Sequence, residues 1–248
     1  MADASVRDPR DRATRVYGQI VSAPGVRTVP FYFVNDTSAS MEGLKIAQAN
    51  AALAEAVPLL QDQERSLCVH FEIKLLQVGG AATWLAEDAA RPDDFKPPRF
   101  AVSGRTPFGA AFDLLAVEMA QLDARASERR DILAPAILIV SDGQPNDAWE
   151  EPLERLLATA AGRASRRLAT AIGEDCRRDI LARFTGDPEM VYAVTELYEM
   201  AATIRACTLT LSRLAATGVR RAASDGAAAA LGGASDDFYT RFVDGFSS

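Results

Sequence analysis

Short apolar runs alternate with longer segments of helical periodicity along the chain, and this pattern predicts an α/β protein. Strands are predicted over residues 29–34, 67–73, 137–140, 167–172 and 190–194. The first run is apolar throughout, which is typical of a strand buried on both faces of a parallel sheet. In the second run apolar and polar residues alternate, so one face of that strand is more polar.

Helices are predicted between these strands, over residues 43–60, 109–123, 175–184 and 197–214. Pro58 is expected to end or kink the first helix, because proline cannot donate a backbone hydrogen bond. Gly186 is expected to stop the third helix. Asp147 and Glu150 are expected to cap a further helix that begins near residue 150, which would keep Asp147 out of a metal site.

A Gly79-Gly80 pair between apolar segments predicts a tight hairpin. The hairpin would place an antiparallel strand beside an otherwise parallel sheet. Alternation of strands and helices then predicts a doubly wound, mostly parallel six-stranded sheet with one antiparallel edge strand.

Three short polar clusters carry the candidate chemistry. Asp36, Ser38 and Ser40 follow the first strand, Thr106 lies in a Gly-containing loop, and Asp142 follows the strand at 137–140. Carboxylates and hydroxyls suit Mg²⁺, Mn²⁺ or Ca²⁺ rather than zinc. We expect these side chains to meet on loops at the carboxyl edge of the sheet, outside the core, and to bind one divalent ion.

The residues around these clusters resemble the metal-ion-dependent adhesion site of von Willebrand factor A domains. The segments 33–41, 103–111 and 141–150 look like the bacterial tellurium-resistance-associated TerY-type proteins, and the resemblance covers residues 28–216. It implies that Ser38, Ser40 and Thr106 bind the metal directly. It also implies that Asp36 and Asp142 reach the ion directly or through water.

Two positions depart from the family pattern, since Ala39 and Arg105 stand where the family usually has glycine. Neither change removes a ligand. Ala39 would be strained only if its φ were positive. Arg105 is either a cation beside the metal or an exposed loop residue.

Composition narrows the classes of partner. The formal charge is −7, from 27 basic and 34 acidic residues, and no basic run or aromatic-basic stripe suggests nucleic acid. Three scattered cysteines form neither a zinc motif nor a disulfide framework. The sequence shows no signal peptide and no membrane span, so a cytoplasmic location is expected.

The predicted organisation is an N-terminal arm at 1–27, one von Willebrand factor A domain at 28–216 and an Ala/Gly-rich tail at 217–248. The tail ends in an aromatic segment at 236–246, which is expected to dock either on this domain or on a partner.

Binding is favoured over catalysis. The single histidine, His70, has no companion, and no nucleophile elbow, Walker motif or dinucleotide fingerprint occurs. The alternative is a metal-dependent phosphoester hydrolase that uses Asp36. The resemblance implies an adaptor in a bacterial stress or metal-resistance phosphorylation system, with a protein kinase and a PP2C-type phosphatase as partners. An acidic side chain of such a partner would bind the ion.

Overall fold

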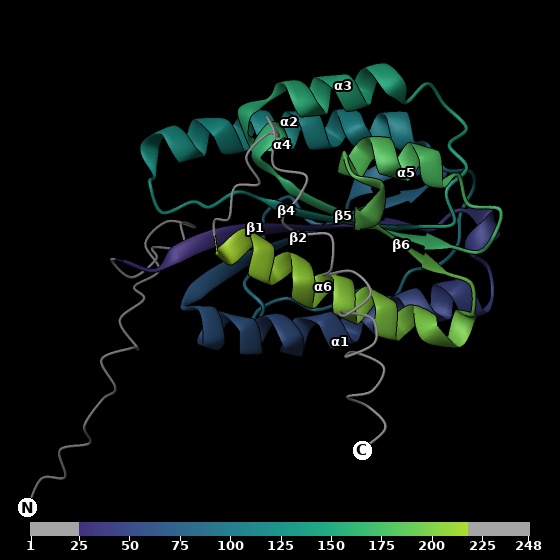
Figure 1. Cartoon of the computed structure of the whole chain (residues 1–248), viewed down its shortest axis with the longest axis horizontal. Helices are drawn as coiled ribbons and strands as arrows, with labels where there is room; N and C mark the ends of the chain where they lie inside the picture. The colour runs from purple at the N-terminus through teal and green to yellow at the C-terminus, as the bar shows by residue number, and fades with distance from the viewer. Residues whose placement is uncertain (1–24, 218–248) are drawn as a thin grey trace, which may run out of the picture. The chain divides into compact units, whose positions relative to one another are not determined.

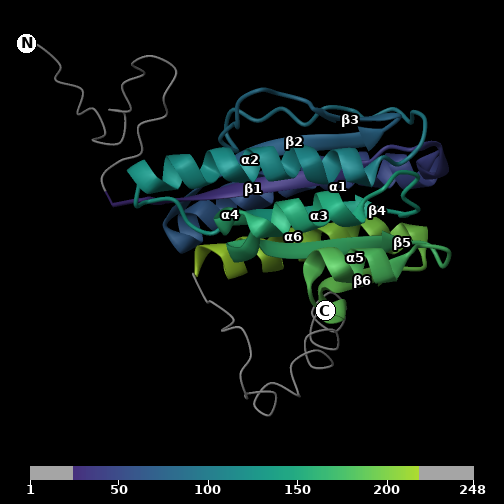
Figure 2. The same cartoon turned by 90° about the horizontal axis from the view of Figure 1, so that it is seen from above.

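The computed structural model describes residues 25–217, and it shows one six-stranded sheet between two layers of helices (Figure 1). The strand order is β3-β2-β1-β4-β5-β6, so β3 and β6 lie at opposite margins of the sheet (Figure 2). The strands are β1 (Arg27–Asp36), β2 (Val69–Gly79), β3 (Ala81–Trp84), β4 (Ala136–Ser141), β5 (Arg166–Ile172) and β6 (Val191–Val194). Five strands are parallel and β3 pairs antiparallel with β2, which confirms the predicted fold.

Two hydrophobic layers hold the helices on the sheet. Helices α1 (Leu44–Leu67) and α6 (Met200–Ala216) cover one face, and α2 (Phe108–Glu128), α3 (Glu150–Ala158), α4 (Ala160–Ala164) and α5 (Arg178–Thr185) cover the other (Figure 1). Side chains of the central strand β1 alternate between the layers. Phe31 and Phe33 pack in the layer of α1 and α6, and Tyr32 and Val34 pack in the layer of α2.

Helix α1 is longer than predicted, because it continues through Pro58 as far as Leu67. Leu60 and Gln63, both beyond the proline, are still buried. Their packing compensates for the hydrogen bond that Pro58 cannot make, a loss of about 3 kcal/mol in a helix interior. Cys68 then ends the helix in a left-handed conformation with φ 52°, so it is not part of the strand predicted to start at Leu67.

The prediction that Asp147 caps the helix near residue 150 is wrong, because it caps a different helix. The carboxylate of Asp147 accepts hydrogen bonds from the backbone N–H groups of Gly109 and Ala110, at 2.9 and 3.1 Å, and so caps α2. Helix α3 begins after Trp149 without a side-chain cap. A Cβ at Gly109 would lie 2.2 Å from the carbonyl oxygen of Ala148, so glycine permits this close approach.

The more polar face of β2 is buried rather than exposed to solvent. Lys74 Nζ lies 2.5 Å from a carboxylate oxygen of Glu118 on α2. Arg125 of the same helix lies 2.6 Å from Glu72. Tyr32 also donates to Glu118, at 3.1 Å. The polar positions of β2 therefore join the sheet to α2.

Two short 3-10 segments, η3 (Pro188–Met190) and η4 (Leu197–Glu199), flank β6. Over residues 25–217, no helix has the length and apolar character needed to cross a membrane. Residues 1–24 of the predicted arm at 1–27 lie outside the described residues, as do residues 218–248 of the predicted tail at 217–248, which include the aromatic segment at 236–246. The arm and the tail therefore stay predictions.

Candidate functional site

The candidate site lies where the carboxyl ends of β1 and β4 meet. These strands are parallel neighbours, and Asn35 pairs with Val140 at the end of their register. From β1 the chain continues to β2, which lies on one side of β1 in the sheet, whereas β4 lies on the other side. The carboxyl edge between β1 and β4 is therefore a topological switch point. The next residues along each strand, Asp36 and Ser141, therefore lie side by side.

Asp36 is the last residue of β1 and has no exposed surface. One carboxylate oxygen accepts from the backbone N–H of Ser38 at 2.8 Å, and the other accepts from the Ser141 hydroxyl at 2.5 Å. The expectation that it sits on a loop outside the core is wrong, because the strand carries Asp36 into the core before the chain turns. Replacing it would leave two buried donors without their acceptor.

Burial raises the pKa of Asp36, and the nearby negative charge of Asp142 raises it further, while the hydrogen bonds from Ser141 and Ser38 oppose the shift. A cation close to both carboxylates would favour their ionised forms.

A chain of hydrogen bonds joins the other residues of the first and third clusters. The hydroxyls of Ser38 and Ser40 are 3.0 Å apart. Ser40 donates to one carboxylate oxygen of Asp142 at 2.8 Å, and Lys45 donates to the other at 2.6 Å. The turn η2 (Ala39–Met41) presents Ser40 to Asp142.

Thr106 reaches this edge through backbone contacts of its loop. Its carbonyl oxygen accepts from the backbone N–H of Asn146 at 3.2 Å, and Gly104 accepts from Ala39 at 2.9 Å. Thr106 is 4% exposed, and no hydrogen bond of its hydroxyl is found within residues 25–217. A hydroxyl without a protein partner is available as a ligand. The structure thus ties together the three loops that were predicted to converge.

The two departures from the family pattern do not disturb the loops. Ala39 is not among the described residues with positive φ, so its methyl group causes no backbone strain. Arg105 is exposed, which agrees with its interpretation as an exposed loop residue. Its carbonyl oxygen accepts from the backbone N–H of Gly80 at 2.8 Å. Gly104 has φ 59°, and a Cβ there would lie 2.4 Å from the Cα of Gly80. Glycine is therefore required at 104, next to Arg105.

The oxygen donors fit a hard divalent cation. Asp36 and Asp142 supply carboxylates, and Ser38, Ser40 and Thr106 supply hydroxyls, with no sulfur or imidazole among them. Within residues 25–217, no group of three or more His, Cys, Asp or Glu side chains is placed to hold a metal. A metal at this edge would therefore need the hydroxyl oxygens as well as the carboxylates.

Sequence reasoning gave no role at this edge to two residues, Ser141 and Lys45. Ser141 precedes Asp142 directly, and its position at a strand end was a usable signal. Lys45 is 97 residues from Asp142 in the chain, and no local pattern links the two.

His70 lies away from this edge. It pairs with Thr28 near the start of β2, whereas the site lies at the other end of the parallel strands. Its Nδ1 atom is 3.8 Å from Glu64, and burial lowers its pKa. The single histidine of the chain therefore cannot act as a base at the candidate site.

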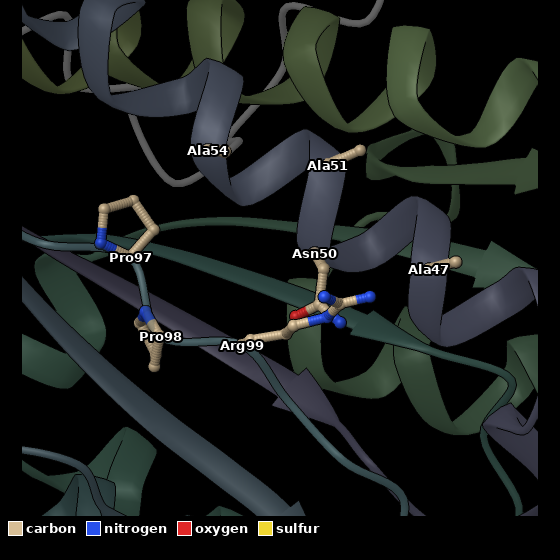
Figure 3. A pocket seen from close by; sticks show the side chains of 7 residues that line it. All are labelled: Ala47, Asn50, Ala51, Ala54, Pro97, Pro98 and Arg99. Atoms are coloured by element: carbon tan, nitrogen blue, oxygen red, sulfur yellow. The ribbon is translucent and has the colours of Figure 1, made fainter.

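A pocket of about 310 Å³ lies between α1 and the segment before Thr106. It is lined by Ala47, Asn50, Ala51 and Ala54 of α1 and by Pro97, Pro98 and Arg99 opposite them (Figure 3). The Asn50 amide is already used, since it accepts from Phe100 N at 2.7 Å and donates to Phe100 O at 3.1 Å. Asn50 therefore anchors this segment to α1.

Comparison with known proteins gives structural neighbours only, since no family model and no curated protein sequence matches. A von Willebrand factor type A protein from Catenulispora acidiphila is similar with a TM-score of 0.59 and 15% identity, over 76% of this chain and 46% of that one. The chain has the von Willebrand factor A fold.

Two other neighbours carry the same fold. The pilus adhesin SpaC from Lactobacillus rhamnosus GG has a TM-score of 0.58 and 13% identity, over 77% of this chain and 31% of the adhesin. Proximal thread matrix protein 1 from the mussel byssus, with a zinc-occupied MIDAS motif, has a TM-score of 0.52 and 14% identity, over 75% of this chain and 46% of that protein. The chain thus spans less than half the length of these three neighbours.

Proposed function

We propose that this chain is a metal-dependent protein-binding module. One divalent ion, Mg²⁺ or alternatively Mn²⁺ or Ca²⁺, would be held by Ser38, Ser40 and Thr106, with Asp36 and Asp142 reaching it directly or through water. The observation that carries the proposal is that backbone hydrogen bonds tie the Thr106 loop to the loops after β1 and β4, where side-chain hydrogen bonds join Ser38, Ser40 and Asp142. The zinc-occupied MIDAS motif of the mussel protein supports a divalent metal on this fold.

The partner would supply an acidic side chain. Three of the proposed ligands are neutral hydroxyls, and both oxygens of Asp36 already accept hydrogen bonds. A divalent ion in such a shell supplies a positive charge with an open position for an anionic oxygen. Aspartate or glutamate on another protein fits that position. With His70 remote from this edge, the arrangement favours binding over turnover.

The biological setting that we propose is a bacterial stress or metal-resistance phosphorylation system in the cytoplasm. There the chain would act as an adaptor for a protein kinase and a PP2C-type phosphatase. Support comes from the resemblance of segments 33–41, 103–111 and 141–150 to TerY-type proteins.

Calorimetric titration with Mg²⁺ and Mn²⁺ tests the proposal. One site is expected, and Thr106→Val should weaken binding at least about tenfold, because it removes a ligand oxygen while it keeps the side-chain shape. Thr37→Val is the matched control: Thr37 is also buried with a partnerless hydroxyl, but it is not a proposed ligand. Equal affinity of the wild type and Thr106→Val would contradict the assignment.

Binding of the purified candidate partners should then require metal. EDTA and Thr106→Val should each weaken it sharply, and excess Mg²⁺ should restore full binding only in the EDTA-treated wild type. Metal-dependent release of phosphate from p-nitrophenyl phosphate, absent in Thr106→Val, would instead support the hydrolase alternative.

A further inference from the structure

The ammonium group of Lys45 lies inside the candidate site, although the proposed metal shell does not use it. Lys45 Nζ is 2.6 Å from the Oδ2 atom of Asp142. The side chains of the pair are 25% and 7% exposed. This pair is thus largely shielded from water, and its charges interact more strongly than those of a surface ion pair.

The local chain path explains why Lys45 returns to the site. The chain leaves the edge through η2 and then turns at Gly43, which has φ 80°. Helix α1 begins at the next residue, so Lys45 lies in its first turn. A lysine is unusual there, because the helix dipole favours negative charge at a helix N-terminus. Its contact with Asp142 offsets that unfavourable position.

Both carboxylates of the site are consequently occupied by donors of the chain itself. Asp142 accepts from Ser40 and Lys45, and Asp36 accepts from Ser38 and Ser141. A cation that binds Asp142 would lie close to the positive charge of Lys45.

We propose that Lys45 is an internal counter-cation of Asp142 that competes with the divalent ion. The inference rests on the proposed function and adds a regulatory feature to the same site. Lys45 stabilises the metal-free form, and metal binding requires it to release Asp142. The site therefore responds to a rise in the concentration of divalent metal instead of holding the ion permanently.

Titration of Mn²⁺, followed by the loss of its free-ion electron paramagnetic resonance signal, tests this competition. Lys45→Met should bind Mn²⁺ about tenfold more tightly than the wild type, because the competing charge is gone. Lys96→Met is the matched control: it changes the net charge equally, and no ion pair of Lys96 is found within residues 25–217. Its affinity should stay within about twofold of the wild type.

Whether Lys45→Met raises or lowers the affinity for Mn²⁺ separates this proposal from its alternatives. If Lys45 only positions Asp142, Lys45→Met binds Mn²⁺ more weakly, and the inference is overturned. Equal binding by Lys45→Met and the wild type overturns the inference alone and leaves the proposed function standing. Absence of binding by both proteins overturns the proposed function as well, whereas binding by Lys45→Met alone supports the inference.

A second measurement needs no metal. In EDTA, Lys45→Met should lower the urea midpoint of unfolding, because Asp142 loses its counter-charge. In an Asp142→Asn background the same substitution should have little effect. An equal loss in both backgrounds, or no loss in either, would show that the two charges are not coupled and would overturn the inference.

Discussion

At the scale of single residues, Cys68 shows how one backbone angle joins two elements. It is the one non-glycine residue with positive φ within residues 25–217, at φ 52°. It lies between the end of α1 and the start of β2, and its N–H bonds to the carbonyl of Glu64. This left-handed conformation is disfavoured for residues with a Cβ and is readily adopted by glycine.

Cys68→Gly should therefore raise the free energy of unfolding, by up to about 1 kcal/mol. The gain is limited, because glycine also increases the entropy of the unfolded chain. Urea denaturation of the variant checks this, with Cys68→Ala as the control that removes the thiol but keeps the Cβ. A glycine variant less stable than the alanine variant would show that the backbone angle is not under strain.

At the scale of elements, the contact between β2 and α2 depends on buried charge. Lys74 and Glu118 are 2.5 Å apart, with side chains 9% and 10% exposed. Lys74 Nζ also lies 4.7 Å from the ring centroid of Trp84, which places β3 in the same contact. The positions of β2 that the sequence shows as a polar strand face thus form its interface with α2. The charged residues of this interface depend on one another.

Lys74→Met should destabilise the protein by about 3 kcal/mol, because it leaves the carboxylate of Glu118 buried without a counter-charge. Lys74→Met combined with Glu118→Met should recover most of that loss, since both charges are then gone. Arg155→Met is the control: its pair with Asp113, at 2.8 Å, is about half exposed and should contribute less than about 1 kcal/mol. Thermal and urea unfolding measure all three. Equal losses from Lys74→Met and Arg155→Met would contradict the role of burial.

At the scale of the whole molecule, the candidate site brings together segments that are far apart in the chain. Asp36 and Ser141 are separated by 105 residues and are joined by a hydrogen bond. The proposed ligands meet only in the folded state, so an ion that binds them binds the native protein and not the unfolded chain.

Divalent metal should consequently stabilise the fold. At about 100 times the dissociation constant, Mg²⁺ should add about 2.7 kcal/mol to the free energy of unfolding. Thr106→Val, which binds at least about tenfold more weakly, should gain no more than about 1.4 kcal/mol at the same concentration, whereas its stability in EDTA should match that of the wild type. Differential scanning calorimetry with and without Mg²⁺ measures both effects. An unchanged transition in the wild type would contradict a native-state metal site.

The sequence by itself determined the order of strands and helices, the hairpin at Gly79-Gly80 and the doubly wound sheet. These follow from hydrophobic periodicity and turn chemistry, which act over a few residues. It also indicated which polar clusters should converge, because parallel strands end at one edge. In the structure, hydrogen bonds join the loops that carry these clusters.

Only the tertiary structure decided which side chains are partners across the chain. Lys45 contacts Asp142, Asp147 caps α2 rather than α3, and α1 continues past Pro58. Each outcome reflects packing between distant segments that outweighs a local preference. Which group caps a helix, neutralises a charge or lies at a helix end depends on which groups the fold brings within contact distance. Local sequence patterns do not contain that information.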